Sequence, residues 1–128
     1  MVPPPPASSI PRRRIDPVAG REALRSWSEE PASASTAVRR LAVRFSLEEL
    51  AARAPGHAVE IRVPPDGVTQ AVAGPRHTRG TPPSVVEADP AAWLDLVTGR
   101  LTWDDAVANH RVRASGERTD LSAHLPIL

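Results

Sequence analysis

Residues 89–121 read DPAAWLDLVTGRLTWDDAVANHRVRASGERTDL, and this stretch decides the fold. Its first part predicts a helix, because Asp89 can cap the free amides and Pro90 suits the first helical turn. Gly99 can adopt the left-handed conformation that often ends a helix. One face of this helix is apolar and consists of Trp93, Leu96 and Val97. Such a face predicts packing against other elements of a core.

A second, shorter helix is predicted directly after the first. Thr102 is its expected cap, and Asp105 follows three residues later, at the spacing of a capping box. Trp103 and Val107 lie four residues apart and therefore share one side of this helix. Asp104 and Asp105 fall in its first turn, where the helix dipole favours anions, and this structural role accounts for the pair.

Four short segments predict strands. AVEIRV, residues 58–63, alternates apolar and charged side chains as a half-buried strand does. PPDG, residues 64–67, has turn chemistry, so VTQAVA, residues 68–73, is expected to return beside the first strand as a hairpin. The third and fourth strands are expected at SVVEA, residues 84–88, and VRASG, residues 112–116.

The first part of the chain predicts a proline-rich arm followed by two helices. Residues 1–17 hold many prolines and little apolar surface, which predicts a disordered or extended arm. Residues 18–30 predict a short amphipathic helix. Residues 35–53 predict a longer helix covered on two faces, because apolar side chains lie on nearly opposite sides. Residues 41–45 also alternate like a strand, with a new helix starting at Ser46, but no turn residue separates the two segments.

Composition excludes several classes of protein. The chain has 16 basic residues, all Arg, against 15 acidic ones, and only three Trp and one Phe, so it lacks the clustered charge and exposed aromatics of a nucleic-acid binder. It has no Cys, which is compatible with the cytoplasm and excludes a thiolate nucleophile or Cys-ligated metal. Neither a membrane-spanning run nor a signal-peptide core occurs, so a cytoplasmic protein without stable membrane insertion is expected. No histidine spacing predicts a metal site, and no cofactor motif occurs.

One loop carries a cluster of cations. Residues 74–89, GPRHTRGTPPSVVEAD, place Arg76, His77 and Arg79 among glycines and prolines. Guanidinium groups suit carboxylates and phosphates, so these three residues are candidates for an anionic head group. The same pattern also fits a rigid turn with solvated cations, and the sequence leaves both readings open.

The second half of the chain resembles the sterol carrier protein family. The resemblance rests on residues 89–121, quoted above, and on PGHAVEIRVPPDGVTQAVAGPRHTRGTPPSVVEAD, residues 55–89, which is similar to a bacterial branch of that family. It covers roughly Ala37 to Leu128. The family often has Gly after the second helix, where this chain has Asn109, a residue that tolerates the left-handed conformation.

The resemblance implies an α+β fold. Length and composition predict a single domain, residues 18–128. It implies a mixed sheet of about five strands with helices packed on one face. In better-known members an apolar tunnel between sheet and helices takes sterols or fatty acyl chains. The residue patterns by themselves predict the same order of strands and helices, but they do not predict the tunnel.

The leading hypothesis is a non-catalytic carrier of an apolar or amphipathic ligand. Its candidate wall consists of Trp93, Leu96, Val97, Trp103 and Val107, although such stripes more often form a core. Leu121 and Leu125, on a last helical turn that Asp120 can cap, are the candidate lid. Arg76, His77 and Arg79 are the candidates for an acidic head group.

Two other classes stay open. One is a protein-interaction module related to the C-terminal domain of mycothiol-dependent isomerases, without lipid binding; this chain is too short to add the helical metal-binding domain of those enzymes. The other is an enzyme acting on an anionic substrate through the cationic loop, which is the least favoured because no partner for a general base can be named. The sequence does not indicate the oligomeric state.

Overall fold

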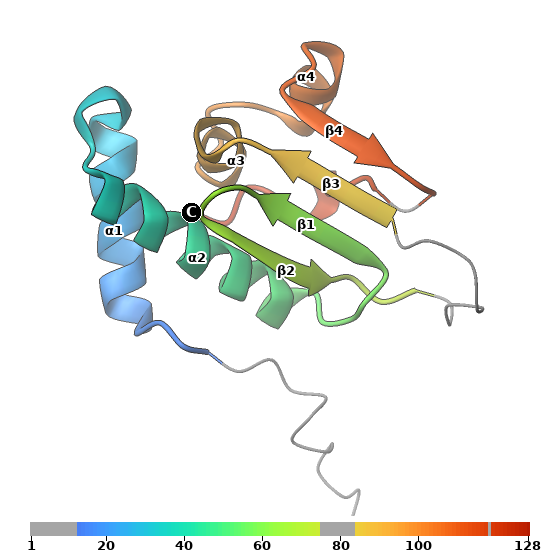
Figure 1. The fold of residues 1–128 in the computed structure, drawn as a ribbon, viewed down its shortest axis with the longest axis horizontal. Helices are drawn as coiled ribbons and strands as arrows, with labels where there is room; N and C mark the ends of the chain where they lie inside the picture. Colours follow the sequence, from blue (N-terminus) through green and yellow to red (C-terminus); the bar gives the residue numbers. More distant parts are fainter. Residues whose placement is uncertain (1–12, 75–83, 118) are drawn as a thin grey trace, which may run out of the picture.

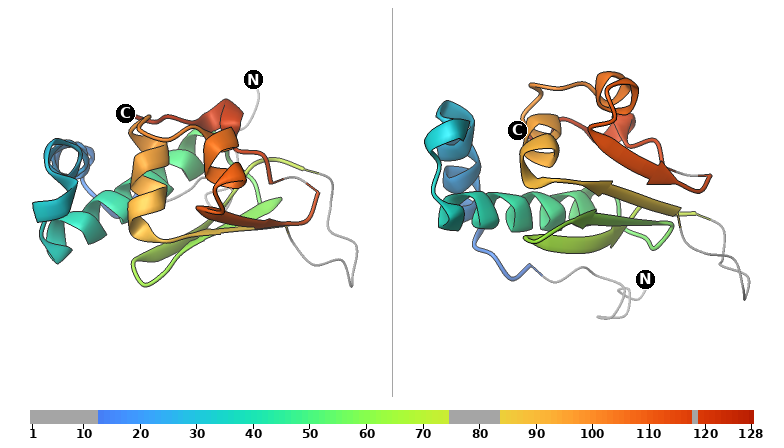
Figure 2. Two further views of the ribbon diagram at one scale, coloured as in Figure 1. Left: turned by 90° about the horizontal axis from the view of Figure 1, so that it is seen from above. Right: turned by 45° about the horizontal axis from the view of Figure 1, so that its top comes forward.

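The computed structural model describes residues 13–74, 84–117 and 119–128. These residues form a mixed sheet with helices packed on one of its faces (Figures 1 and 2). The elements in chain order are α1 (Pro17–Glu29), the 3-10 helix η2 (Pro31–Ser33), α2 (Thr36–Arg53), β1 (Val59–Val63), β2 (Gly67–Ala71), β3 (Ser84–Ala88), α3 (Pro90–Val97), α4 (Trp103–Ala108), β4 (Val112–Ser115) and the 3-10 helix η3 (Ser122–His124). The expected α+β class is confirmed.

The sheet has the strand order β2-β1-β3-β4. β1 is antiparallel to β2 and parallel to β3, and β4 is antiparallel to β3. All four strands expected from alternation and turn chemistry are present, and β1 with β2 forms the expected hairpin. The resemblance implied about five strands, whereas the described residues contain four. The residue pattern predicted four strands, as observed; the number five came from the resemblance alone.

The alternation along β1 decides which face of the sheet is covered. Val59, Ile61 and Val63 are fully buried beneath the helices, whereas Arg62 on the opposite face is exposed and Glu60 is half-buried. Figure 2 shows α2 and α3 on the covered face. The period of two thus separates a core side of the sheet from an open side.

α2 is one continuous helix, as preferred over the strand alternative for residues 41–45. It begins at a Ser35 cap whose Oγ accepts from the Val38 amide at 3.1 Å. It packs between α1 and β2, so both of its apolar sides are covered as expected. Phe45 lies against Gly20 of α1, and Leu47 lies against Gly67 of β2.

Residues 13–16, the described part of the expected arm before α1, make contacts with α1 and α2. The carboxylate of Glu48 accepts from the backbone amides of Arg14 and Ile15 at 3.0 and 3.2 Å. Arg13 pairs with Glu49, and Asp16 caps α1. Of the expected arm, residues 1–17, the structure describes residues 13–17. Hydrogen bonds and an ion pair to Glu48 and Glu49 attach this part to α2. Carboxylates far along the chain supply the acceptors, which the proline content of the arm does not reveal.

Both C-terminal helices end in turns with a left-handed residue. Gly99, with φ 78°, ends the α3 region as expected, because its amide donates to the Leu96 carbonyl at 3.3 Å. After α4 the left-handed residue is His110, with φ 56°, whereas Asn109 has φ −95°. Asn109 tolerates the left-handed conformation, but the following residue, His110, adopts it instead. Asn109 is the C-cap of α4, and the Arg111 amide then closes the turn on the Ala106 carbonyl at 2.8 Å.

The core contains a buried polar contact. Trp93 and Ser46 have no exposed surface, and Trp93 Nε1 donates to Ser46 Oγ at 2.8 Å. The same hydroxyl donates to the Val43 carbonyl at 2.8 Å. Within the described residues, every buried side-chain nitrogen and oxygen has a hydrogen-bond partner. The layer between α2 and α3 is thus a specifically paired core rather than a loose apolar interior.

Candidate functional site

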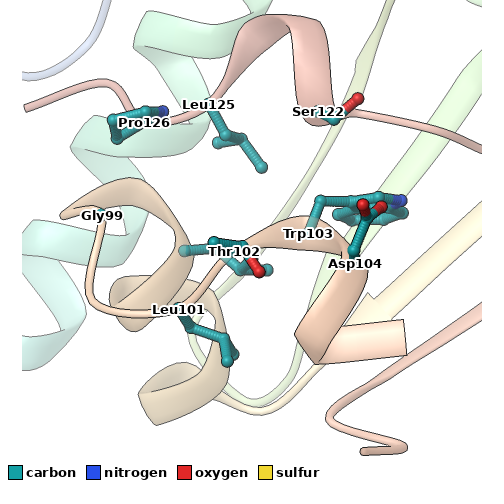
Figure 3. A pocket seen from close by; sticks show the side chains of 9 residues that line it. Gly99, Leu101, Thr102, Trp103, Asp104, Ser122, Leu125 and Pro126 are labelled. Carbon is teal, nitrogen blue, oxygen red and sulfur yellow. The ribbon is translucent and has the colours of Figure 1, made fainter. Parts of the chain in front are cut away.

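A cavity of ≈ 310 Å³ lies between the loop that leads from α3 into α4 and the C-terminal segment (Figure 3). We call it the α4 groove. Its lining residues are Leu96, Gly99, Leu101, Thr102, Trp103, Asp104, Ser122, Leu125 and Pro126. Figure 3 shows Leu125 extending into this space from the C-terminal segment.

The first wall of the α4 groove follows from the helix-ending turn at Gly99. The positive φ of Gly99 reverses the chain, so that the next residues run back to the start of α4. Thr102 Oγ1 then accepts from the Asp105 amide at 3.2 Å and starts the helix. This cap fixes Trp103 and Asp104 in the first helical turn, where both face the groove.

The second wall is the C-terminal segment, which is held at both ends. At one end Leu121 is fully buried, and Asp120 Oδ1 accepts from the Ser122 amide at 2.9 Å. Hydrogen bonds from Ser122 also lower the pKa of the Asp120 carboxyl below its ordinary value. At the other end the amides of Ile127 and Leu128 donate to the Val97 carbonyl at 2.9 and 3.0 Å. Leu125 lies between these anchors.

The groove combines an apolar floor with a polar rim. Leu96 is buried at the bottom, Trp103 is 8% exposed, and Leu101 and Leu125 are half-buried. The rim consists of the exposed residues Thr102, Asp104 and Ser122. Such a mixture suits a ligand that is apolar along most of its length and polar at one end.

The structure brings three of the predicted apolar site residues together. Leu96, Trp103 and Leu125 line the groove. Trp93, Val97 and Leu121 have no exposed surface and lie in the core. Val107 is 46% exposed and is not among the residues that line the groove. The stripe on α3 is thus mainly core, which was the commoner reading of such a pattern.

The polar part of the site was not anticipated. Arg76, His77 and Arg79, the predicted head-group residues, lie outside the described residues. Thr102 and Asp104 were singled out in the sequence, but only for capping and for the helix dipole. Ser122 gave no signal. The closeness of Gly99 and Thr102 in the sequence could have indicated these residues. A helix-ending glycine followed at once by a helix cap predicts a tight turn, and polar side chains of such a turn lie at the surface.

Metal-binding clusters and membrane-spanning helices are both absent from the described residues. In the described part of the chain, no group of three or more His, Asp or Glu side chains is arranged to hold a metal ion. His57, for example, pairs with Gln70 through a 2.7 Å contact from Nδ1 to Oε1. None of the helices in residues 13–74, 84–117 and 119–128 is long and apolar enough to cross a membrane.

The fold is of the α+β class, and its groove lies beside the two short helices that follow the sheet strands. A half-covered mixed sheet is followed by two short helices, a small strand and a C-terminal segment that closes over an apolar groove. The family model described as bacterial SCP ortholog matches residues 35–127, and the chain belongs to this family. α1 precedes the matched region. No curated protein matches the chain.

Proposed function

We propose that this protein binds a small apolar or amphipathic ligand in the α4 groove and carries it without transforming it. The observation that carries the proposal is the groove itself, where apolar side chains of both walls lie beneath a polar rim. Membership of the sterol carrier-like family supports it. Leu96, Trp103 and Leu125 serve as the apolar wall, and Leu125 covers part of the ligand from the C-terminal segment.

The size of the groove limits the ligand. At about 30 Å³ per non-hydrogen atom, the share of one water molecule in the liquid, a cavity of ≈ 310 Å³ holds about ten such atoms. A short alkyl chain fits within this space, whereas a sterol with its fused rings would extend beyond the open side of the groove. Burying about ten methylenes contributes on the order of 8 kcal/mol before the costs of association. Useful affinity therefore requires no catalytic group.

Tryptophan emission tests the proposal directly, because Trp103 lines the groove. Titration of the purified protein with 1-decanol should give a saturable change in emission, since the ligand displaces water from the indole. In the Trp103→Phe variant this change should be lost while decanol still binds by calorimetry. Trp27→Phe is the matched control, because Trp27 is buried on α1 and does not line the groove. Absence of saturable binding in calorimetry would refute the carrier function.

A protein-interaction module is the second candidate, and the open face of the sheet favours it. A shallow cavity of ≈ 390 Å³ lies on this face beside the β1–β2 turn, lined by Glu60, Arg62, Pro64, Pro65, Gly67, Val68 and Glu87. Native mass spectrometry of the freshly purified protein separates the two candidates. A carrier retains a small molecule, whereas an interaction module retains a protein partner. The role of Arg76, His77 and Arg79 toward an acidic head group stays a prediction.

A further inference from the structure

One side chain among the described residues brings a formal charge to the α4 groove. Asp104 is the single charged side chain among the described residues that line it. It is exposed at the rim, and none of the described residues donates a hydrogen bond or pairs with its carboxylate. A free carboxylate at the mouth of an apolar groove attracts a cation and repels an anion.

The basic residues nearest in sequence are engaged elsewhere. Arg100 lies over the Trp27 ring, with its guanidinium carbon 5.7 Å from the ring centroid. Arg111 pairs with Asp95 through a 3.2 Å contact. Neither lines the groove. Among the described residues that line the groove, none is a cation that could pair with the carboxylate of a fatty acid.

The rest of the rim also suits a hydrogen-bond donor. Thr102 and Ser122 contribute hydroxyl oxygens, each of which has lone pairs to accept hydrogen bonds. Thr102 Oγ1 accepts from only one described donor, the Asp105 amide. An ammonium group has three donors and no acceptor, so it can donate to the Asp104 carboxylate and keep donors for neighbouring hydroxyls or water.

We infer that the α4 groove selects short alkylamines over fatty acids of the same length, with Asp104 as the residue that selects them. This inference rests on the proposed function, because it names the ligand class of the same groove. Exposed ion pairs alter affinity by about twofold to fivefold. Since the amine is attracted and the acid is repelled, their affinities should differ on the order of tenfold at low salt.

The experiment compares decylamine, 1-decanol and decanoate by calorimetry at neutral pH, below the concentrations at which they form micelles. The protein should bind decylamine most tightly and decanoate least tightly. Asp104→Asn should weaken decylamine binding about twofold to fivefold, strengthen decanoate binding and leave decanol unchanged. Asp105→Asn is the matched control, because Asp105 occupies the same helical turn but does not line the groove. If D104N lowers the melting temperature, Asp104→Ser replaces it.

The possible outcomes separate the two proposals. If decanol binds but the amine and the acid bind equally, the charge selection is wrong and the carrier function stands. The same holds if D104N and D105N alter decylamine binding equally. If decanol does not bind, the proposed function fails and this inference fails with it. High salt should reduce the difference between amine and acid without affecting decanol.

Discussion

Replacing Ser46 by Ala tests whether the helical layer is a solid core or an open tunnel. The substitution removes the acceptor of Trp93 Nε1, which lies 2.8 Å from Ser46 Oγ with neither residue exposed. A buried donor left without a partner costs about 1–3 kcal/mol. Ala favours a helix slightly more than Ser, which offsets a few tenths of a kcal/mol. We therefore expect a loss of about 1–2 kcal/mol in the free energy of unfolding.

The measurement is urea denaturation followed by circular dichroism, together with thermal melting. For a domain near 100 residues, each kcal/mol lowers the melting temperature by about 4–8 °C, so S46A should lower it by about 4–16 °C. Ser26→Ala is the matched control, because Ser26 is exposed on α1. It should stay within about 0.5 kcal/mol of the wild type, as surface substitutions usually do.

A small effect of S46A would refute the solid core. If S46A and S26A lost the same stability, water would be replacing the lost acceptor, as it can in an open tunnel. Trp93→Phe extends the test, because it removes the donor while keeping an aromatic ring. In a double-mutant cycle, S46A and W93F should couple, since the two side chains share one hydrogen bond. Additive effects would mean that the bond contributes nothing.

Two further substitutions test the packing of α1 and the N-terminal segment on α2. In Gly20→Ala the added Cβ would overlap the ring of Phe45, so the variant should lose about 1–3 kcal/mol of stability, and a higher melting temperature would contradict this packing. Burial raises the pKa of Glu49, but contacts from Arg13 and Arg53 outweigh it and the net pKa is lowered. Its contribution to stability is therefore present above the ordinary pKa of 4.5 and lost as the pH falls through the lower folded value. Glu49→Gln should lower the urea midpoint at neutral pH and match the wild type in acid; a constant difference would contradict the ion pairs.

Much of the fold could be predicted because its signals are local. Asp89, Thr102 and Gly99 act on backbone groups within three or four residues, so a cap or a stop is visible in the sequence itself. The position of the N-terminal segment could not be predicted in this way. It depends on Glu48, 34 residues from Arg14. Nothing in a short window shows that this carboxylate will face two free amides.

The site was harder to predict than the fold. The apolar stripe on α3 shows which side chains face the interior, but it does not show which residues of other elements pack against them. Trp93 and Leu96 do face the same way, toward the interior. The sequence could not show that Ser46 of α2 would fill the space beside Trp93, whereas the space beside Leu96 would stay open. That difference arises from contacts between α2 and α3 that join residues 47 positions apart.

The α4 groove and the end of the fold depend on the same contacts. Leu96 belongs to the core and also forms the floor of the groove, and the neighbouring Val97 carbonyl anchors Ile127 and Leu128. The groove has its second wall only while these hydrogen bonds hold the C-terminal segment in place. A ligand that contacts Leu125 therefore binds the docked segment and not the released one. By linkage, such a ligand must stabilise the docked state in proportion to its differential affinity. Ligand binding and docking of the C-terminal segment are thus thermodynamically coupled. Exchange of the Ile127 and Leu128 amides with solvent deuterium should therefore slow as ligand is added.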